Sequence, residues 1–154
     1  MKVGQIYLES SPDDGATHFS AIVEALDKLA IDQHVLVADV ALARSLHALP
    51  YVTVGPVVRT PIMAYCLMPE VDVVHIHDDR SGQTGLLMTL TRSVPFILSS
   101  PQQPDTRNPL KRSVIRRAHR ILSPRETDPE TLIEAYRRTI DAWSKLPQDA
   151  DCGQ

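Results

Sequence analysis

The sequence predicts one α/β domain, a parallel sheet of about six strands with helices on both faces. Short segments rich in β-branched residues alternate along the chain with longer segments whose apolar residues recur at three- and four-residue steps. Such an alternation is typical of βαβ units. The 154 residues are enough for one core, and no internal repeat or low-complexity tract divides them.

The expected strands are short apolar segments, most of which end at a turn-forming or polar residue. The fourth is the most strand-like, because Val71, Val73 and Ile76 are β-branched, which suits a strand covered on both faces. The strands are expected at residues 3–8, 34–38, 51–54, 71–78, 94–98 and 119–123.

The expected helices alternate with these strands. The last has the clearest start, with Asp128 as the cap, Pro129 at the first helical position and Glu130 in the first turn. Its apolar spacing extends the helix to about residue 145. The helices are expected at residues 15–29, 41–49, 60–68, 82–92, 110–118 and 129–145.

Two helices are expected to follow the loops that end the first and fourth strands. The first begins near Gly15, where Asp13 or Asp14 could cap it. The other begins after Ser81, its expected cap, and is expected to carry its leucines inward. These leucines are Leu86, Leu87 and Leu90.

The composition indicates a cytoplasmic globular protein with an aliphatic core, at 43% hydrophobic and 5% aromatic residues. Cys66 and Cys152 lie far apart with no metal-type spacing, which indicates reduced thiols. The N-terminus lacks the apolar run of a signal peptide, and no segment approaches about 18 uninterrupted apolar residues. We therefore expect a cytoplasmic protein, with peripheral membrane contact on the inner face as an option.

A ligand site is expected where the first and fourth strands end. If the strands follow the common order 3-2-1-4-5-6, these two are neighbours at the switch point, where open α/β sheets bind ligands. The loops after them would then face each other across one crevice. The predicted site residues are Asp13, Gly15, His18, His77, Arg80 and Ser81.

Each predicted contact has a chemical reason and an alternative. His77 could donate to a hydroxyl or balance a phosphate; the alternative is a hydrogen bond within its own loop. Gly15 would let an anion approach a helix start; the alternative is a turn glycine with positive φ. Arg80 could clamp an anion; the alternative is a solvated arginine, or a pair with Asp78 or Asp79.

Three further residues near these loops have weaker signals. His18 lies one turn into the first helix, where it could face the crevice. Ser81, with the glycines that follow it, could receive a phosphate or carboxylate, and the alternative is a simple helix cap. His75 is expected on the face opposite His77, as a structural histidine packed under a helix.

A basic cluster follows the fifth strand. Residues 107–154 hold 10 Lys and Arg against 7 Asp and Glu, whereas residues 1–106 hold 6 against 12. A basic amphipathic helix can contact anionic lipid headgroups; the alternative is a solvated charged face. The helix residues expected to contact a membrane or another anion are Lys111, Arg112, Arg116 and Arg117.

Other ligand classes are not expected. The net charge is −3 and no aromatic platform accompanies the basic residues, so we expect no nucleic-acid partner. Two adjacent aspartate pairs, 13–14 and 78–79, could hold a hard cation. Adjacent side chains point apart, however, and aspartates favour turns and caps, so we expect no metal site and no cofactor.

Two motifs resemble those of a known family. Residues 14–18, Asp-Gly-Ala-Thr-His, resemble the opening loop and helix of family-four retaining glycosyltransferases of the GT-B fold, although the family commonly has two glycines here. Residues 72–77, Asp-Val-Val-His-Ile-His, are similar to the family's "DVVHxH" strand. The resemblance covers roughly residues 1–125 and the acceptor-side, N-terminal half of such an enzyme.

The resemblance implies a single Rossmann-like domain over residues 1–146, with 147–154 as a flexible tail. It places His77 beside the transferred sugar, with a sugar or lipid-linked acceptor in the crevice. The implied role is glycosyl transfer in cell-surface polysaccharide or lipopolysaccharide synthesis.

The family's nucleotide-sugar half is not expected within these residues. The chain should therefore be inactive unless a second chain or self-association supplies that half. The alternatives are a non-catalytic carbohydrate-binding or interaction module, and a nucleotide-binding regulator on the same fold.

Overall fold

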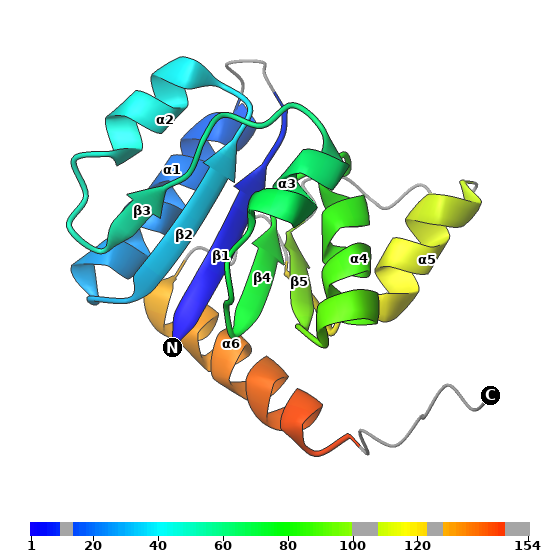
Figure 1. Cartoon of the computed structure of the whole chain (residues 1–154). Helices are drawn as coiled ribbons and strands as arrows, with labels where there is room; N and C mark the ends of the chain where they lie inside the picture. Colours follow the sequence, from blue (N-terminus) through cyan, green and yellow to red (C-terminus); the bar gives the residue numbers. More distant parts are fainter. Residues whose placement is uncertain (10–13, 100–107, 123–127, 147–154) are drawn as a thin grey trace.

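The computed structural model describes residues 1–9, 14–99, 108–122 and 128–146, and within them it confirms the predicted fold class. Six parallel strands form one sheet, with six helices around it (Figure 1). The expected strand 71–78 is shorter than predicted, at Val73–Ile76. The strands are β1 (Lys2–Tyr7), β2 (Asp32–Val37), β3 (Val52–Val54), β4 (Val73–Ile76), β5 (Phe96–Ser99) and β6 (Arg120–Leu122). The helices are α1 (Asp14–Lys28), α2 (Val40–Leu46), α3 (Pro61–Leu67), α4 (Gly82–Arg92), α5 (Pro109–Arg117) and α6 (Pro129–Ser144).

The strand order is β3-β2-β1-β4-β5-β6, which confirms the predicted order. β1 and β4 are therefore central neighbours, and their register pairs Gln5 with His75 and Ile6 with Ile76. The pairing continues beyond β4, where the His77 N–H donates to the Ile6 carbonyl at 3.1 Å. All strands run the same way, so their carboxyl ends share one edge of the sheet, at the top of Figure 1.

The helices form two layers, because alternate residues of each strand face opposite sides of the sheet. α3, α4 and α5 cover one face, packing on Ile6, Val74 and Ile76. α1, α2 and α6 cover the other, where α6 crosses behind the sheet in Figure 1 and packs on Val3 and Val73. Gln5, His75 and His77 face this second layer.

Four helices begin at side chains that cap free backbone N–H groups. Asp128 accepts from the Thr131 N–H at 3.0 Å, which confirms the predicted start of α6. Asp39, Thr60 and Asn108 do the same for α2, α3 and α5. Ser81 precedes α4, but its side chain makes no capping hydrogen bond, so the predicted cap is wrong in its chemistry.

The buried face of α4 differs from the prediction. Leu90 is 54% exposed, and Leu86 and Leu87 are only partly buried. The buried face holds Gly82, Thr84, Gly85 and Met88. The glycines let the helix approach its neighbours closely: a Cβ at Gly85 would lie 2.7 Å from Phe96 Cδ2, and one at Gly82 would lie 2.9 Å from Val114 Cγ1. Small residues therefore mark the contact face, which a search for large apolar residues misses.

Replacing Gly85 by alanine is expected to destabilise the domain. Alanine favours a helix over glycine by about 1 kcal/mol, but the added methyl group would overlap the Phe96 ring. Overpacking of a core typically costs 1–3 kcal/mol, and the upper half of that range applies here because the Phe96 ring is fully buried. We therefore expect a net loss of about 1–2 kcal/mol in urea unfolding. Gln83→Ala, at an exposed position of the same helix, is the matched control. A Gly85→Ala protein as stable as the wild type would contradict this packing.

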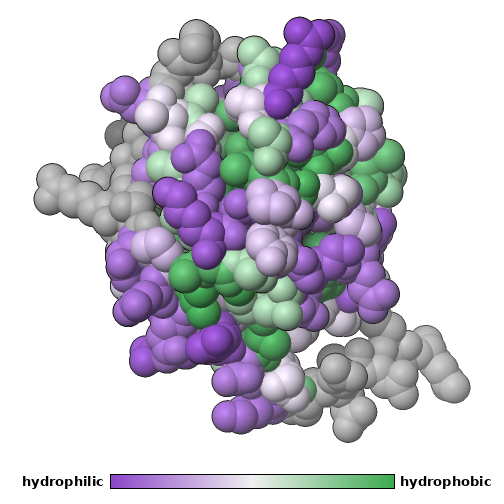
Figure 2. Space-filling model, turned by 90° about the vertical axis from the view of Figure 1, so that its left-hand side faces the viewer, coloured by the Kyte–Doolittle hydropathy of each residue, from purple (hydrophilic) through white to green (hydrophobic). Residues whose placement is uncertain are grey.

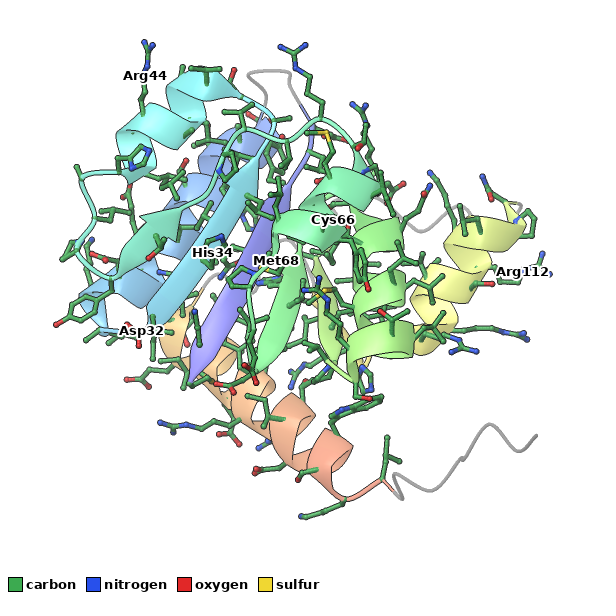
Figure 3. The ribbon with its side chains drawn as sticks, in the orientation of Figure 1. Asp32, His34, Arg44, Cys66, Met68 and Arg112 are labelled. Carbon is green, nitrogen blue, oxygen red and sulfur yellow. The ribbon has the colours of Figure 1, made fainter. Side chains whose placement is uncertain are left out.

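The chain after α3 packs against the middle of the sheet (Figure 3). Met68 is buried, and a Cβ at Gly4 of β1 would lie 2.8 Å from its sulfur atom. Cys66 is an exposed free thiol, as expected, whereas Cys152 lies outside the described residues. Gly4 thus makes room for the methionine that follows α3.

One edge of the sheet is formed by the three-residue strand β3. Figure 2 views the molecule from this side and shows hydrophobic residues interleaved with hydrophilic ones. Val40 and Tyr51, which flank α2 and β3, are among the exposed large hydrophobic residues. A short edge strand offers few free backbone groups for pairing with another chain.

Candidate functional site

The carboxyl ends of β1 and β4 meet, as the strand order predicts. The Leu8 N–H, just after β1, donates to Asp78 Oδ2 at 2.7 Å, just after β4. Both residues are buried, at 0% and 2% exposure. The two loops that the sequence places at one crevice are therefore joined directly at their bases.

Asp78 holds this edge of the sheet together. Its Oδ1 accepts from the Ser81 N–H at 2.7 Å, and its Oδ2 accepts from the Ser81 hydroxyl at 2.8 Å. Burial raises the pKa of Asp78, while hydrogen bonds from Leu8 and Ser81 partly oppose that shift. The carboxylate is thus committed to the backbone, and it neither pairs with Arg80 nor offers a free ligand to a metal.

Ser81 is buried and its hydroxyl is occupied by Asp78. The substrate contact that the sequence predicts for Ser81 stays a prediction, because a ligand would have to replace this internal partner. Gly82 and Gly85, the proposed anion-receiving glycines of the same segment, pack instead on Val114 and Phe96. This helix start serves packing in the described structure.

His77 is 6% exposed and bonds across the sheet rather than within its loop. Its Nε2 lies 2.6 Å from Gln5 Oε1, while its Nδ1 is buried and has no hydrogen-bond partner among the described residues. The His77 and Phe19 rings form a T-shaped pair, with 4.8 Å between their centroids. Burial, followed by the proximity of His75 and His18, lowers the pKa of His77 well below 6.5, so the ring is neutral at pH 7.

His75 lies on the same face as His77, so the predicted opposite orientation is wrong. Residues two apart in a strand share a face, and the two ring centroids are 3.9 Å apart. The structural role is confirmed: His75 Nδ1 lies 2.7 Å from the Tyr136 hydroxyl on α6, and Nε2 lies 2.6 Å from Ser99 Oγ. Burial lowers the pKa of His75 to about 3.

The first helix supplies the facing wall. His18 is partly buried, its Nε2 has no partner among the described residues, and burial lowers its pKa. A charge on His18 would lower the pKa of both His75 and His77. Gly15 is the second residue of α1 and its φ is not positive, so the turn-glycine alternative is wrong. Asp13, with its predicted cap and ligand roles, lies outside the described residues.

Arg80 pairs with neither neighbouring aspartate. Its Nη2 donates to the Arg59 carbonyl at 2.9 Å, and its guanidinium is exposed. The two arginines, with Asp39 and the start of α2, line an open pocket of about 400 Å³. This volume falls within the range of small-ligand pockets, so a cationic concavity lies at the same edge of the sheet.

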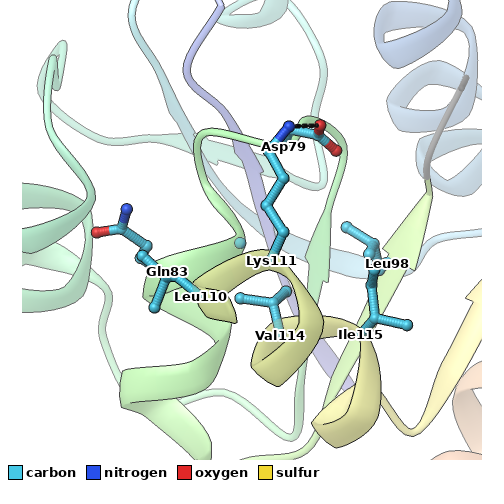
Figure 4. Close-up of a pocket in the computed structure, with 8 residues that line it drawn as sticks. Asp79, Gln83, Leu98, Leu110, Lys111, Val114 and Ile115 are labelled. Carbon is cyan, nitrogen blue, oxygen red and sulfur yellow. Dashed lines mark hydrogen bonds and ion pairs between the residues drawn. The ribbon is translucent and has the colours of Figure 1, made fainter. Parts of the chain in front are cut away.

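The basic residues of α5 include an ion-paired lysine and three exposed arginines. Lys111 forms an ion pair with Asp79 at 2.6 Å (Figure 4). Beneath it an apolar pocket of about 30 Å³ lies between α4 and α5, room for roughly one water molecule. Arg116 and Arg117 are exposed, and Arg112 lies on the outer side of α5 (Figure 3). The membrane or anion contact stays a prediction.

No helix in the described ranges is long and apolar enough to cross a membrane. No group of three or more potential metal-ligating side chains occurs in the same ranges.

Sequence reasoning missed Gln5, Gln33 and Tyr136, which surround the two histidines. A weak signal was present, since glutamine is uncommon in a buried strand and both glutamines interrupt apolar strands. Polar residues within expected core strands deserve a search for partners, because buried polar groups are nearly always hydrogen-bonded.

Comparisons with known proteins reveal the fold. No family model and no curated protein matches the sequence. Among solved structures, Anabaena Alr3699/HepE in complex with UDP-glucose matches with a TM-score of 0.58 and 14% identity over 88% of this chain and 40% of that one. HepE in complex with UDP and glucose matches with a TM-score of 0.57 and 13% identity, over 88% and 41%.

A third match, to a glycotransferase of kitacinnamycin, has 22% identity over 93% of this chain and 40% of that one. Its TM-score of 0.47 is too low to establish a common fold. This chain spans about two fifths of the length of the HepE chain. At these identities the HepE likeness shows the fold alone, the Rossmann-like arrangement described above.

Proposed function

We propose that this chain is the acceptor-side domain of a retaining, family-four-like GT-B glycosyltransferase. In this proposal the sugar part of an acceptor binds at the carboxyl ends of β1 and β4. The observation that carries it is His77, which is buried at the switch point with Nδ1 unpartnered among the described residues. The sequence motifs at residues 14–18 and 72–77 support it, as does the likeness to a protein solved with UDP and glucose.

The electrostatics of the site favour a hydroxyl at His77. The pKa of the ring lies well below 6.5, which favours a hydroxyl over a phosphate, the other role considered from the sequence. A neutral imidazole still exchanges hydrogen bonds with hydroxyl groups. A charged part of the acceptor would instead meet Arg80 and Arg59 in the adjoining pocket.

Transfer needs a nucleotide-sugar domain in addition to this one. The described residues form a single six-stranded sheet, so we propose that the donor is held by a second domain, whichever polypeptide carries it. A second chain or a second copy of this one could supply it. The expected setting is the synthesis of cell-surface polysaccharide or lipopolysaccharide, with the exposed arginines of α5 near a lipid-linked acceptor.

The proposal predicts sugar binding that depends on His77. Glucose, UDP and UDP-glucose are titrated separately into the protein while amide resonances near His18 and His77 are followed by NMR. We expect glucose to bind, and His77→Ala to weaken it at least about tenfold, equivalent to about 1.4 kcal/mol. His47→Ala, which removes an exposed histidine on the opposite end of α2 from the site, is the control.

Other outcomes would redirect the assignment. Binding of UDP alone, unaffected by His77→Ala, would contradict the proposal and favour a nucleotide-binding regulator. Sugar binding without transfer, even with candidate donor domains present, would favour a non-catalytic carbohydrate-binding module. Robust transfer by this chain alone would refute the need for a second domain.

A further inference from the structure

A row of buried side-chain amides leads across the sheet to His77. Gln33 on β2 and Gln5 on β1 are 2% and 0% exposed, and Gln5 contacts the His77 ring. Both glutamines lie under α1, on the face that also holds His75. The hydrogen bonds of this row can run in only one direction, because Gln33 contacts a group that can only accept a hydrogen bond.

That group is the backbone carbonyl of Val23 in α1. Gln33 Nε2 donates to it at 2.9 Å, so the Gln33 oxygen must point the other way, toward Gln5. Gln5 Nε2 then donates to Gln33 Oε1 at 3.3 Å. The carbonyl of one helix residue thus sets the orientation of the Gln33 amide, whose oxygen then accepts from Gln5.

The orientation of the Gln5 amide determines which nitrogen of the His77 ring carries the hydrogen. With its nitrogen turned toward Gln33, Gln5 presents Oε1 to His77 Nε2 at 2.6 Å. An amide oxygen only accepts, so Nε2 must carry the hydrogen. A neutral imidazole has one N–H, and Nδ1 is therefore a bare acceptor.

No described neighbour competes for that acceptor. Both nitrogens of His75 are engaged by Tyr136 and Ser99, and Phe19 offers a hydrocarbon edge. His18 has its own unpartnered Nε2. A buried acceptor without a donor is costly, and a ligand hydroxyl would satisfy it.

We propose that Gln5 and Gln33 are positioning residues that hold His77 as the Nε2–H tautomer, so that Nδ1 selects a hydrogen-bond donor of the ligand. This inference rests on the proposed sugar site and specifies its chemistry. A sugar hydroxyl donates to Nδ1, whereas the dianion of a phosphate monoester has only acceptor oxygens and would meet a lone pair. The site thereby favours the hydroxyl face of a sugar over its phosphorylated form.

The tautomer can be measured without any ligand. In protein labelled with ¹⁵N-histidine, two-bond ¹H–¹⁵N correlation spectra distinguish protonated from bare ring nitrogens, and His77→Ala assigns the signals. At pH 7 we expect His77 with Nε2 protonated and Nδ1 bare. The opposite tautomer in the wild-type protein would overturn the inference whether or not sugar binds.

Variants test the role of the row. Gln5→Met removes the acceptor for Nε2–H at similar volume, and Gln33→Met removes one of the two side chains that hold the Gln5 amide, the other being Tyr136. Either should shift His77 toward a mixture of tautomers. Gln83→Met, an exposed glutamine on α4, should leave the spectrum unchanged. If Gln5→Met fails to fold, Gln33→Met decides the question. An unchanged tautomer in every folded variant would refute the positioning role.

Ligand titrations followed by the same NMR spectra distinguish this inference from the proposed function. Glucose should shift the His77 Nδ1 resonance, and its affinity should fall several-fold in Gln33→Met, while sulfate, which has only acceptor oxygens, should leave Nδ1 unmoved. If glucose does not bind but the tautomer is as expected, the proposed function fails and the positioning role stands. A sulfate-induced shift of Nδ1 would overturn the selectivity for donors.

Discussion

Lowering the pH from 7 to 5 is expected to reduce the free energy of unfolding by about 4 kcal/mol, a large part of the 5–15 kcal/mol typical of a domain. The cause is the pair of buried histidines. The pKa of His75 is lowered to about 3 and that of His77 lies well below 6.5, mainly through burial. In the unfolded chain both rings titrate near 6.5.

The sign follows from which state binds protons. Below pH 6.5 the unfolded chain takes up protons that the folded protein excludes, so stability falls until the folded pKa values are reached. Each ring contributes about 2 kcal/mol between pH 7 and 5. The lowered pKa values of His18, His34 and His119 act in the same direction.

Asp78 acts in the opposite direction. Its pKa is raised by burial above 3.8, so between 3.8 and the raised value the folded state holds a proton that the unfolded state has lost. Stability from this group therefore rises as the pH falls through that window. This effect opposes the loss of stability caused by the histidines wherever the two pH windows overlap.

Urea unfolding followed by circular dichroism at pH 7, 6 and 5 measures this dependence. His75→Gln should remove about half of it, because the amide does not titrate, even if the variant is less stable at pH 7. His47→Gln replaces an exposed histidine and should leave the dependence intact. Equal stability at pH 7 and 5 would show that the two histidines are not buried as neutral rings.

Asp78→Ala is expected to cost about 3–4 kcal/mol, the second large effect. The substitution leaves two buried backbone donors, the N–H groups of Leu8 and Ser81, without their acceptor, and each unsatisfied buried group costs about 1–3 kcal/mol. It also releases the Ser81 hydroxyl. The joint between the ends of β1 and β4 should therefore open before the rest of the domain.

The neighbouring aspartate provides a matched comparison. Asp79→Ala removes only an exposed ion pair to Lys111 and should change stability by less than about 1 kcal/mol. Asp78→Asn should fall between the two, because its NH₂ group would face one of the backbone donors. Hydrogen exchange of the Leu8 amide would report local opening. Equal losses for Asp78→Ala and Asp79→Ala would contradict the role assigned to Asp78.

Much of the fold was predictable from residue patterns. β-branched runs and helical spacing predicted six strands and six helices, and the Asp-Pro-Glu start of α6 was predicted to the residue. The strand order placed the ends of β1 and β4 together, as the structure has them. These features depend on local preference and on common connection rules, both of which a single sequence contains.

The contacts around the candidate site depended on tertiary structure. Periodicity states which face of an element is buried, but not which atoms meet there. A pair between Asp78 and Arg80 was one alternative from the sequence, but Asp78 accepts hydrogen bonds from the backbone N–H groups of Leu8 and Ser81. Leu90 was expected to point into the core but is exposed, whereas Gly85 makes the packing contact with Phe96.

Local residue patterns predict the alternation of strands and helices. They thereby predict the edge of the sheet where a ligand would bind. The state of His77 is decided elsewhere, by strand register and by one α1 carbonyl that orients Gln33 and Gln5. These hydrogen bonds join residues far apart in the chain, and each requires its donor–acceptor distance to be right within a few tenths of an ångström. Such distances exist only once the sheet and its helices have packed.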